Sequence, residues 1–308
     1  MKEGFILSLN VLIIGAGQIA AGYDSPSSTK ILTHAHAIHR HPGFNLIGFY
    51  DTDKKKAAAA AKKWNSQAFD NLSGADILVI CTPDSNHLDS IRQAVALAPK
   101  LIILEKPIAS NYNDAEQIIS AVRGLPTQVN LSRRFIREFQ ALSLDVKYYG
   151  TFLAGTGYYG KGFVHNGSHM IDLLKMLLGE IISVTVLNEF HDYSSDDLTK
   201  DVMIHYNNGG EFYMKGINCN LLTIFELDLI FEKARVKILD SGERIQIFRL
   251  SQSEKYQGYI NFTNSEEIRT EIDNAMYNLY QNIYDFVIHN AELLSPIENA
   301  LTKEVYSI

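Results

Sequence analysis

The stretch NVLIIGAGQIAAG at residues 10–22 contains the residue types of a phosphate-binding turn. In a strand–turn–helix unit, Gly15 would permit the tight turn, Gly17 would let the backbone approach a pyrophosphate, and Ala20 would allow close helix–strand packing. A helix that begins here would offer its free N–H groups and the positive end of its dipole to the phosphates. The motif alone fits a plain glycine turn equally well, so the rest of the chain must decide between the two interpretations.

A carboxylate follows at the place where a bound dinucleotide would need one. Asp51 ends the second apolar run, FNLIGFYD, where it could accept hydrogen bonds from an adenosine ribose and repel a 2′-phosphate. It lies further from the glycines than the usual ~20 residues, which a loop inserted at 23–32 before a helix would explain. Asp51 therefore predicts a preference for NAD(H), while Lys54 and Lys55 directly after it leave NADP(H) open.

Alternating strand-like and helix-like segments must position these residues. Five apolar runs have the character of strands buried on both faces of a parallel sheet, at 10–15, 44–51, 75–83, 100–107 and 127–132. Helix-forming segments lie among them at 33–41, 54–64, 85–98 and 113–124. The alternation predicts an N-terminal Rossmann domain, a doubly wound parallel α/β sheet, over residues 1–126.

The pattern changes in the second half of the chain. A helix is expected at 167–179, followed by alternating segments at 182–190, 201–217, 225–240 and 243–250 that read as antiparallel strands. Asn208, Gly209 and Gly210 supply a turn between two of them. We therefore expect a second, α+β domain over residues 127–308, built on an open antiparallel sheet, with a last helical segment at 270–289 that could pack back on the first domain.

Composition excludes several classes of function. The formal net charge is −7 and the basic residues form no block beyond Lys54–Lys56, so a nucleic-acid partner is not expected. Cys81 and Cys219 have no CxxC neighbour, which argues against a disulfide framework or zinc site and fits a cytoplasmic protein. The apolar N-terminal run is interrupted by Asn10 and is interpreted as a buried strand rather than a signal peptide. No apolar stretch approaches the ~20 residues needed to span a membrane.

Three further stretches, taken with the glycine turn, carry a family resemblance. They are VICTPDSNHLDSI (79–91), LEKPIA (104–109) and GSHMIDLL (167–174). In this order and spacing, the chain resembles the Gfo/Idh/MocA family of NAD(P)-dependent oxidoreductases over nearly its whole length. The resemblance implies a C-terminal substrate-binding and oligomerisation domain, and dehydrogenase chemistry on CH–OH groups of sugars, inositols and nucleotide sugars.

The resemblance also implies roles for individual residues. Lys106 would direct its ammonium group at the substrate hydroxyl beside the nicotinamide, where a positive charge lowers the pKa of that hydroxyl. On residue type alone, Lys106 fits a surface lysine at a strand end better. The residues implied in cofactor binding are Gly15, Gly17, Gln18, Ile19, Asp51, Thr82, Pro83, Asn86, His87, Glu105, Lys106 and Asn130.

Two histidines would serve the substrate side. The resemblance implies that His169 is the general acid/base, a role that suits a group with a pKa near neutrality, and Asp172 lies about one helical turn further on. His165 stands where many polyol-oxidising relatives have Asp, so it could tune or replace the usual proton relay. Tyr158 could line a sugar pocket or could be an ordinary strand aromatic.

Two groups of histidines could also be interpreted as metal ligands, but each has a better explanation. His165 and His169 are four residues apart, a spacing that can bind a metal on a helix, but Asn166 and Gly167 are expected to break the helix between them and no third ligand is evident. The histidines at 34, 36, 39 and 41 lack accompanying Cys, Asp or Glu, which favours a structural role. We therefore expect no metal site.

The sequence thus predicts an oxidoreductase that transfers a hydride between NAD(H) and a secondary alcohol or ketone of a carbohydrate-like substrate. Two alternatives stay open at this point: a redox-neutral glycosidase that keeps its NAD, and a non-catalytic dinucleotide-binding regulator on the same fold. A homodimer or homotetramer is expected, because one face of the second sheet would otherwise expose a broad apolar area.

Overall fold

The computed structural model describes residues 8–300 and 303–306. Within these residues the chain divides into two compact units. The first unit contains residues 8–135 and 273–300, and the second contains 136–272 and 303–306. The division at 135/136 lies nine residues beyond the expected one at 126/127, because the strand at 127–129 is part of the first sheet.

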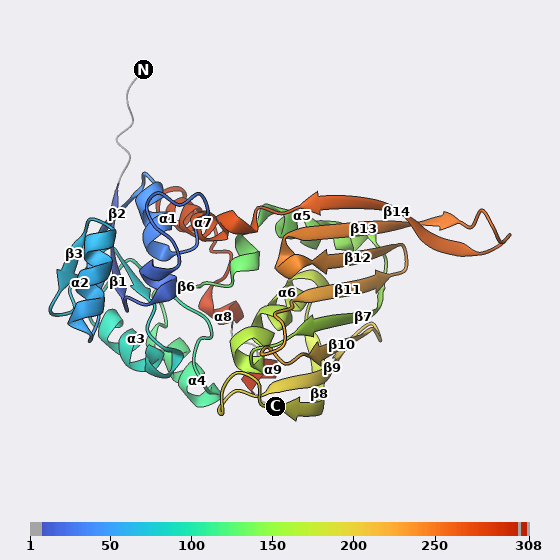
Figure 1. Cartoon of the computed structure of the whole chain (residues 1–308), viewed down its shortest axis with the longest axis horizontal. Helices are drawn as coiled ribbons and strands as arrows, with labels where there is room; N and C mark the ends of the chain where they lie inside the picture. The colour runs from blue at the N-terminus through green and yellow to red at the C-terminus, as the bar shows by residue number, and fades with distance from the viewer. Residues whose placement is uncertain (1–7, 301–302, 307–308) are drawn as a thin grey trace, which may run out of the picture. The chain divides into compact units, whose positions relative to one another are not determined.

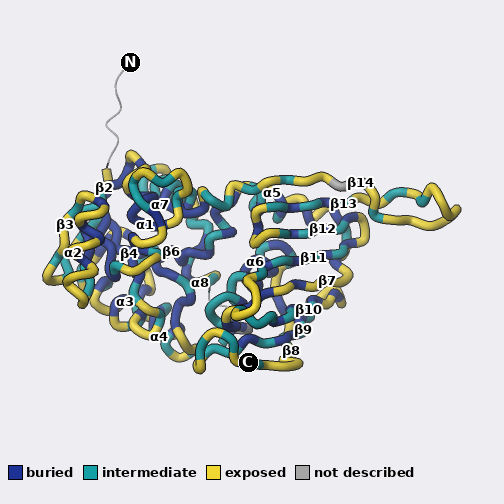
Figure 2. Tube along the Cα trace, in the orientation of Figure 1, coloured by how far each residue is buried: buried dark blue, intermediate teal, exposed yellow. Residues whose placement is uncertain are grey.

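The first unit is built on a parallel sheet of six strands in the order β3-β2-β1-β4-β5-β6. The strands are β1 (Leu9–Ile14), β2 (Phe44–Tyr50), β3 (Gln67–Phe69), β4 (Ile77–Ile80), β5 (Leu101–Leu104) and β6 (Thr127–Val129). The order reverses between β1 and β4, and such a switch point is where open α/β sheets bind ligands. The central strands are buried along their length, as Figure 2 shows in dark blue, which confirms the expectation of strands covered on both faces.

Helices cover both faces of this sheet. They are α1 (His34–Arg40), α2 (Lys54–Lys63), α3 (His87–Val95), α4 (Tyr112–Ala121), α7 (Ala275–His289) and α8 (Ile297–Ala300). The start of α2 is fixed by Asp53, whose carboxylate accepts from the backbone N–H groups of Lys55 and Lys56. Helix α7, which comes from near the C-terminal end of the chain, packs beside α1 (Figure 1).

One local feature of the first unit differs from the sequence expectation and another agrees with it. The short strand β3 was not expected, because its residues are mostly exposed and carry no apolar run. The glycine turn is followed by one helical turn, η1 (Gln18–Gly22), and α1 begins at His34, which agrees with the expected loop at 23–32 and helix at 33–41. Asp24 holds the intervening loop, since its carboxylate accepts from the Leu32 N–H and lies 2.8 Å from His36 Nδ1.

The second unit contains an eight-stranded sheet in the order β14-β13-β12-β11-β7-β10-β9-β8, which Figure 1 displays from one edge to the other. The strands are β7 (Phe152–Tyr159), β8 (Ile181–Phe190), β9 (Thr199–Tyr206), β10 (Glu211–Gly216), β11 (Glu226–Phe231), β12 (Ala234–Leu239), β13 (Arg244–Gln252) and β14 (Ile260–Arg269). Strands β7 and β10 are parallel and the other neighbours are antiparallel, so the sheet is mixed and mostly antiparallel.

Helices α5 (Arg137–Asp145), α6 (Ser168–Leu178) and α9 (Lys303–Tyr306) belong to this unit. Helix α6 packs closely on β7, since a Cβ on Gly157 would lie 2.7 Å from the sulfur of Met170. Side chains alternate along the strands, with Phe212 and Met214 of β10 buried and their neighbours half-exposed.

The opposite face of the second sheet is not the broad apolar surface that the alternation suggested. Asp228 on β11 forms a salt bridge with Arg235 on β12, and Lys237 lies 4.0 Å from the same carboxylate. Lys215 on β10 contacts Asp201 on β9 at 2.6 Å. Charged pairs therefore occupy much of this face, and the sequence expectation is corrected to a mixed surface.

Candidate active site

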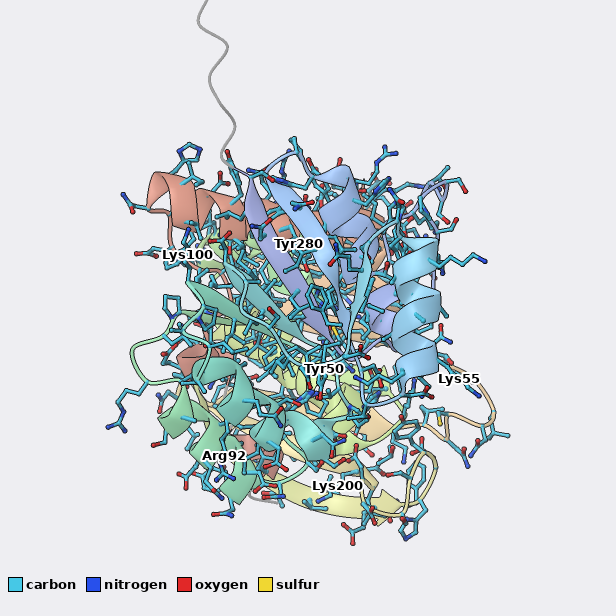
Figure 3. All side chains as sticks on the ribbon, turned by 90° about the vertical axis from the view of Figure 1, so that its left-hand side faces the viewer. Tyr50, Lys55, Arg92, Lys100, Lys200 and Tyr280 are labelled. Atoms are coloured by element: carbon cyan, nitrogen blue, oxygen red, sulfur yellow. The ribbon has the colours of Figure 1, made fainter. Side chains whose placement is uncertain are left out.

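A cavity of about 530 Å³ lies at the carboxyl ends of β1, β2 and β4 in the first unit. Figure 3 labels Tyr50 at the end of β2 and Lys55 on α2. The lining residues are Ile14, Gly15, Ala16, Gly17, Tyr50, Asp51, Thr52, Asp53, Lys56, Leu72, Cys81, Thr82, Pro83, Asn86, Asp89, Ser90 and Gln93. Its place at the switch point of the sheet is that of a dinucleotide site.

The two glycines of the turn have different physical roles. Gly15 has φ +93°, and a Cβ there would lie 2.7 Å from the carbonyl carbon and oxygen of Cys81. Gly17 has an extended backbone that other residues can adopt, and among the described residues no atom lies within 4 Å of its would-be Cβ. Gly15 is thus required by the fold, whereas the space at Gly17 opens into the cavity. Gln18 and Ile19, in the following turn, lie outside the cavity lining.

Asp51 ties the glycine turn to the start of α2. One carboxylate oxygen accepts from the Ala16 N–H at 2.7 Å and the other accepts from the Asp53 N–H at 2.8 Å. Asp51, Asp53 and Asp89 together give the cavity three carboxylates. These carboxylates, called the carboxylate wall, come from both sides of the cavity; they would repel the 2′-phosphate of NADP(H) and still accept hydrogen bonds from a ribose.

The lysine that faces this wall is Lys56, which sequence reasoning missed. Lys54 instead donates to the backbone oxygen of Asp70 and lies 5.3 Å from the ring centroid of Tyr50. Neither Lys54 nor Lys55 lines the cavity, so neither is placed to bind a 2′-phosphate there. Lys56 is the third residue of α2. Which of the three lysines points toward the cavity depends on where the helix begins, and the sequence alone does not fix that start.

A second wall comes from β4 and α3. Thr82, Pro83 and Asn86 line the cavity as the family resemblance implied. Asp89, Ser90 and Gln93 line it as well, and the sequence analysis did not name them. These three residues lie three, four and seven positions after Asn86, a spacing that places them on one face of α3. From Asn86, this helical spacing could have predicted them as lining residues.

His87 has a structural position rather than a cavity position. Its ring nitrogens lie 2.9 Å from the carbonyl oxygen of Thr82 and 3.0 Å from that of Ile108. The ring is buried and joins the end of β4 to the segment that follows β5. We therefore assign it to holding these two loops in place.

Glu105 and Asn130 also lie outside the cavity lining, in a buried network with His34 and Tyr280. Oε1 of Glu105 is 2.8 Å from His34 Nε2 and accepts from Asn130 Nδ2 at 2.6 Å. His34 Nδ1 lies 3.0 Å from the hydroxyl of Tyr280. Burial raises the pKa of Glu105, but the hydrogen bond and charge of His34, the hydrogen bond from Asn130 and the charge of Lys106 outweigh burial, and the pKa lies below its ordinary value.

The substrate-side residues belong to the second unit. His169 is the second residue of α6, and His165 lies in the helical turn η5 (Phe163–Gly167) directly before it. Gly167 has helical angles, φ −59° and ψ −35°, so the expected helix break between the two histidines is wrong. Asp197 stabilises this turn by accepting from the backbone N–H groups of Val164 and His165, both at 2.8 Å.

The remaining candidates of this unit differ in exposure. The ring of His165 stacks on that of Tyr193, with centroids 4.8 Å apart and planes at 27°. Asp172 is buried in α6, and Tyr158 on β7 is 42% exposed. Burial raises the pKa of Asp197, and the hydrogen bonds from the backbone of residues 163–165 offset this effect only in part.

The described part of the chain holds neither a metal site nor a membrane-spanning helix. Over residues 8–300 and 303–306, no group of three or more His, Cys, Asp or Glu side chains is placed to hold a metal ion. None of the helices within those residues has the length and apolar character needed to cross a bilayer.

The N-terminal part of the chain matches a known family of oxidoreductases. Residues 9–131 match the Gfo/Idh/MocA oxidoreductase family, described as having an NAD-binding Rossmann fold. The first unit therefore carries the NAD-binding Rossmann domain of the Gfo/Idh/MocA oxidoreductase family. A curated relative, the uncharacterized protein YMR315W of Saccharomyces cerevisiae, is 24% identical over 324 aligned residues, covering 87% of this chain and 90% of the relative.

Solved structures share the fold over nearly the whole chain. UDP-N-acetylglucosamine 3-dehydrogenase GnnA from Acidithiobacillus ferrooxidans superposes with a TM-score of 0.75 at 15% identity, over 98% of this chain and 95% of that one. The WlbA dehydrogenase from Bordetella pertussis, in complex with NADH and UDP-GlcNAcA, gives 0.73 at 16% identity, over 98% and 92%. An oxidoreductase from Agrobacterium radiobacter, in complex with NAD+, L-tartaric acid and magnesium, gives 0.75 at 14% identity, over 97% and 93%.

Proposed function

We propose that this protein transfers a hydride between NAD(H) and a secondary alcohol or ketone of a sugar, inositol or nucleotide-sugar-like substrate. The observation that carries the proposal is the cavity at the switch point of the Rossmann sheet, with its open space at Gly17 and its carboxylate wall. A dinucleotide fits these features, because the backbone at Gly17 can approach a pyrophosphate and Asp51 can reach a ribose. When bound, the nicotinamide supplies the hydride-exchanging carbon.

The chain's own residues then handle the hydroxyl group and its proton. Lys106 follows β5 and is half-buried, so its ammonium group can stabilise negative charge that develops on the reacting oxygen. His169, at the start of α6, would accept the hydroxyl proton on oxidation and return it on reduction. His165 would assist the transfer of that proton.

The proposed activity is tested with a panel of sugars, inositols and nucleotide sugars, each mixed with NAD and followed by NADH absorbance. Formation of NADH with one class of substrate would support the proposal. Cleavage of a glycoside without net NADH would favour the redox-neutral glycosidase instead. Tight dinucleotide binding with no turnover of any panel member would favour the regulator.

The carboxylate wall predicts the choice of cofactor. We expect NAD(H) to bind at least tenfold more tightly than NADP(H), because the cavity lining holds three carboxylates and one lysine, Lys56, and so carries a net negative charge that disfavours a 2′-phosphate. Asp53→Ser should raise NADP(H) affinity about tenfold, since serine still caps α2 while one negative charge is removed. Calorimetric titration with both cofactors measures the two affinities.

Two variants control this experiment. Asp70→Ser removes an exposed carboxylate that pairs with Lys54 outside the cavity, and should leave both affinities unchanged. Lys56→Ala in the Asp53→Ser background should cancel the gain in NADP(H) affinity. Equal binding of the two cofactors by the unmodified protein would show that the carboxylate wall does not set the preference.

Substitution of His165 tests whether this residue assists the proposed proton transfer at His169. We expect His165→Asn to lower turnover about tenfold or more and to shift the acidic limb of the pH–rate profile, because asparagine cannot carry a proton. His165→Asp should retain much of the activity. His205→Asn, which removes a half-exposed histidine beside Glu211, is the matched control. Full activity of His165→Asn with an unshifted profile would return His165 to a structural role.

We also propose that the protein is a homodimer or homotetramer. Support comes from β8, an edge strand of the second sheet whose exposed side chains include Ile182, Val186 and Leu187. Exposed apolar edge strands are ready sites for pairing with another chain. Light scattering at micromolar concentration should give about 69 kDa or more, at least twice the 34.6 kDa of one chain. A mass near that of one chain would contradict the proposal.

A further inference from the structure

One segment of the second unit holds the backbone of the turn that carries His165. It is the 192–199 segment, which leads from β8 into β9. Five consecutive backbone N–H groups, those of residues 161–165, each donate to an oxygen of this segment. The acceptors, in order, are Asp192 Oδ2 at 2.9 Å, Thr199 Oγ1 at 2.8 Å, Leu198 O at 2.9 Å, and Asp197 Oδ1 and Oδ2, both at 2.8 Å. The N–H groups at the start of a helix lack partners within it, so the 192–199 segment supplies the partners that η5 cannot.

The turn and the 192–199 segment approach each other most closely at Gly162. This residue has φ +79°, and a Cβ there would overlap Oδ2 of Asp197. A side chain at this position would therefore push the carboxylate away from the two N–H groups that it accepts from. The place of the His165 main chain thus depends on the 192–199 segment and on a glycine that lets the two meet.

The imidazole ring of His165 contacts the same segment through Tyr193. The two rings stack with centroids 4.8 Å apart and planes at 27°, a favourable arrangement for an aromatic pair. Lys161 Nζ lies 5.2 Å from the centroid of the Tyr193 ring, within the range of a cation–π contact. Tyr193 is 46% exposed, so burial in a core does not explain its place. Both of these contacts join Tyr193 to the turn that carries His165.

We infer that Tyr193 is a positioning residue that fixes the ring plane of His165, while the 192–199 segment fixes its main chain. The inference rests on the proposed role of His165 in proton transfer. A proton passes only between groups within hydrogen-bond reach, so a ring that rotates freely about its side-chain bonds is correctly oriented for less of the time. Stacking uses the tyrosine ring and not its hydroxyl group, which distinguishes this role from proton transfer by Tyr193 itself.

The first test needs no substrate and observes the His165 ring by NMR. In protein with isotope-labelled histidine rings, His165 is the Cε1–H signal that is missing from His165→Asn. A proton held against the face of an aromatic ring resonates upfield, so Tyr193→Leu should move this signal downfield. Tyr193→Phe, which keeps the ring, should leave it in place. Tyr148→Leu, which removes a 79% exposed tyrosine of the same unit, is the matched control and should also leave it in place.

The second test uses the substrate found in the panel and separates positioning from substrate binding. Tyr193→Leu should lower kcat about tenfold and change KM less than about threefold, because Tyr193 acts through His165. Tyr193→Phe should retain most of kcat. In the His165→Asn background, Tyr193→Leu should add nothing further, because the ring that it positions is then absent. Thermal unfolding of each variant verifies that it is folded.

Two results would overturn the inference. One is an unchanged His165 signal in Tyr193→Leu, which would show that the stack does not orient the ring. The other is a loss of kcat in Tyr193→Leu that is undiminished in the His165→Asn background, which would mean that Tyr193 acts on the substrate directly. If no panel member reacts, the proposed function fails, and the NMR comparison still supports or overturns the positioning of His165 by Tyr193.

Discussion

Gly17→Val is expected to weaken NADH binding on the order of a hundredfold while leaving the stability of the protein unchanged. The backbone at Gly17 is extended, with φ −78° and ψ −165°, so valine can adopt it without strain. Its side chain would enter the open space of the cavity, where the pyrophosphate is proposed to approach the backbone. Calorimetric titration with NADH and thermal unfolding measure the two quantities.

Gly15→Ala is the matched comparison, and the opposite pattern is expected. Its φ of +93° is unfavourable for alanine, and the new methyl group would lie 2.7 Å from the backbone of Cys81. The free energy of unfolding should fall by about 3 kcal/mol or more. If Gly17→Val bound NADH with unchanged affinity, the glycine turn would not be the phosphate site.

Lys106→Met and His169→Asn should each lower turnover on the order of a hundredfold or more, while the affinity for NADH changes less than about threefold. Both side chains are proposed to act on the reacting hydroxyl, whereas the cavity that would hold the dinucleotide is lined by neither residue. Steady-state kinetics with the substrate found in the panel gives turnover, and calorimetry gives affinity.

Lys100→Met is the control for loss of a lysine, because Lys100 is paired with Asp76 and lies outside the cavity lining. Its turnover should match that of the unmodified protein. Retention of full turnover by Lys106→Met or His169→Asn would remove that residue from the reaction. Equal losses of turnover and NADH affinity would instead indicate a damaged cofactor site.

The sheet of the first unit was predictable because burial on both faces leaves an unmistakable apolar run. Strands β4 and β5, with sequences ILVI and LIIL, are examples. Strand β3 was not predicted, because it lies at the sheet edge, has only three residues and is mostly exposed. The helix expected at 33–41 is observed as α1, but the Asp24 contacts that hold the loop before it join residues eight to twelve positions apart and leave no periodic signal.

The cavity was predictable where backbone position alone places a residue. Gly15, Gly17, Asp51 and Thr82 end strands or form the turn, and all four line the cavity. Side-chain direction was harder to predict, because it depends on partners that come from distant segments. Glu105 turns toward His34, 71 residues away, and away from the cavity.

The return of α7 to the first unit has a consequence for how the protein is made. Its residues Leu279, Tyr280 and Ile283 complete the core on the α1 side of the sheet. A ribosome adds about 5–20 residues per second, so roughly 10–30 s pass between synthesis of residue 135 and residue 289. During that interval the apolar surface that α7 will cover has no covering helix, and the nascent Rossmann sheet needs protection from aggregation. A stop codon after the first sheet would therefore yield an insoluble fragment rather than a working nucleotide-binding domain.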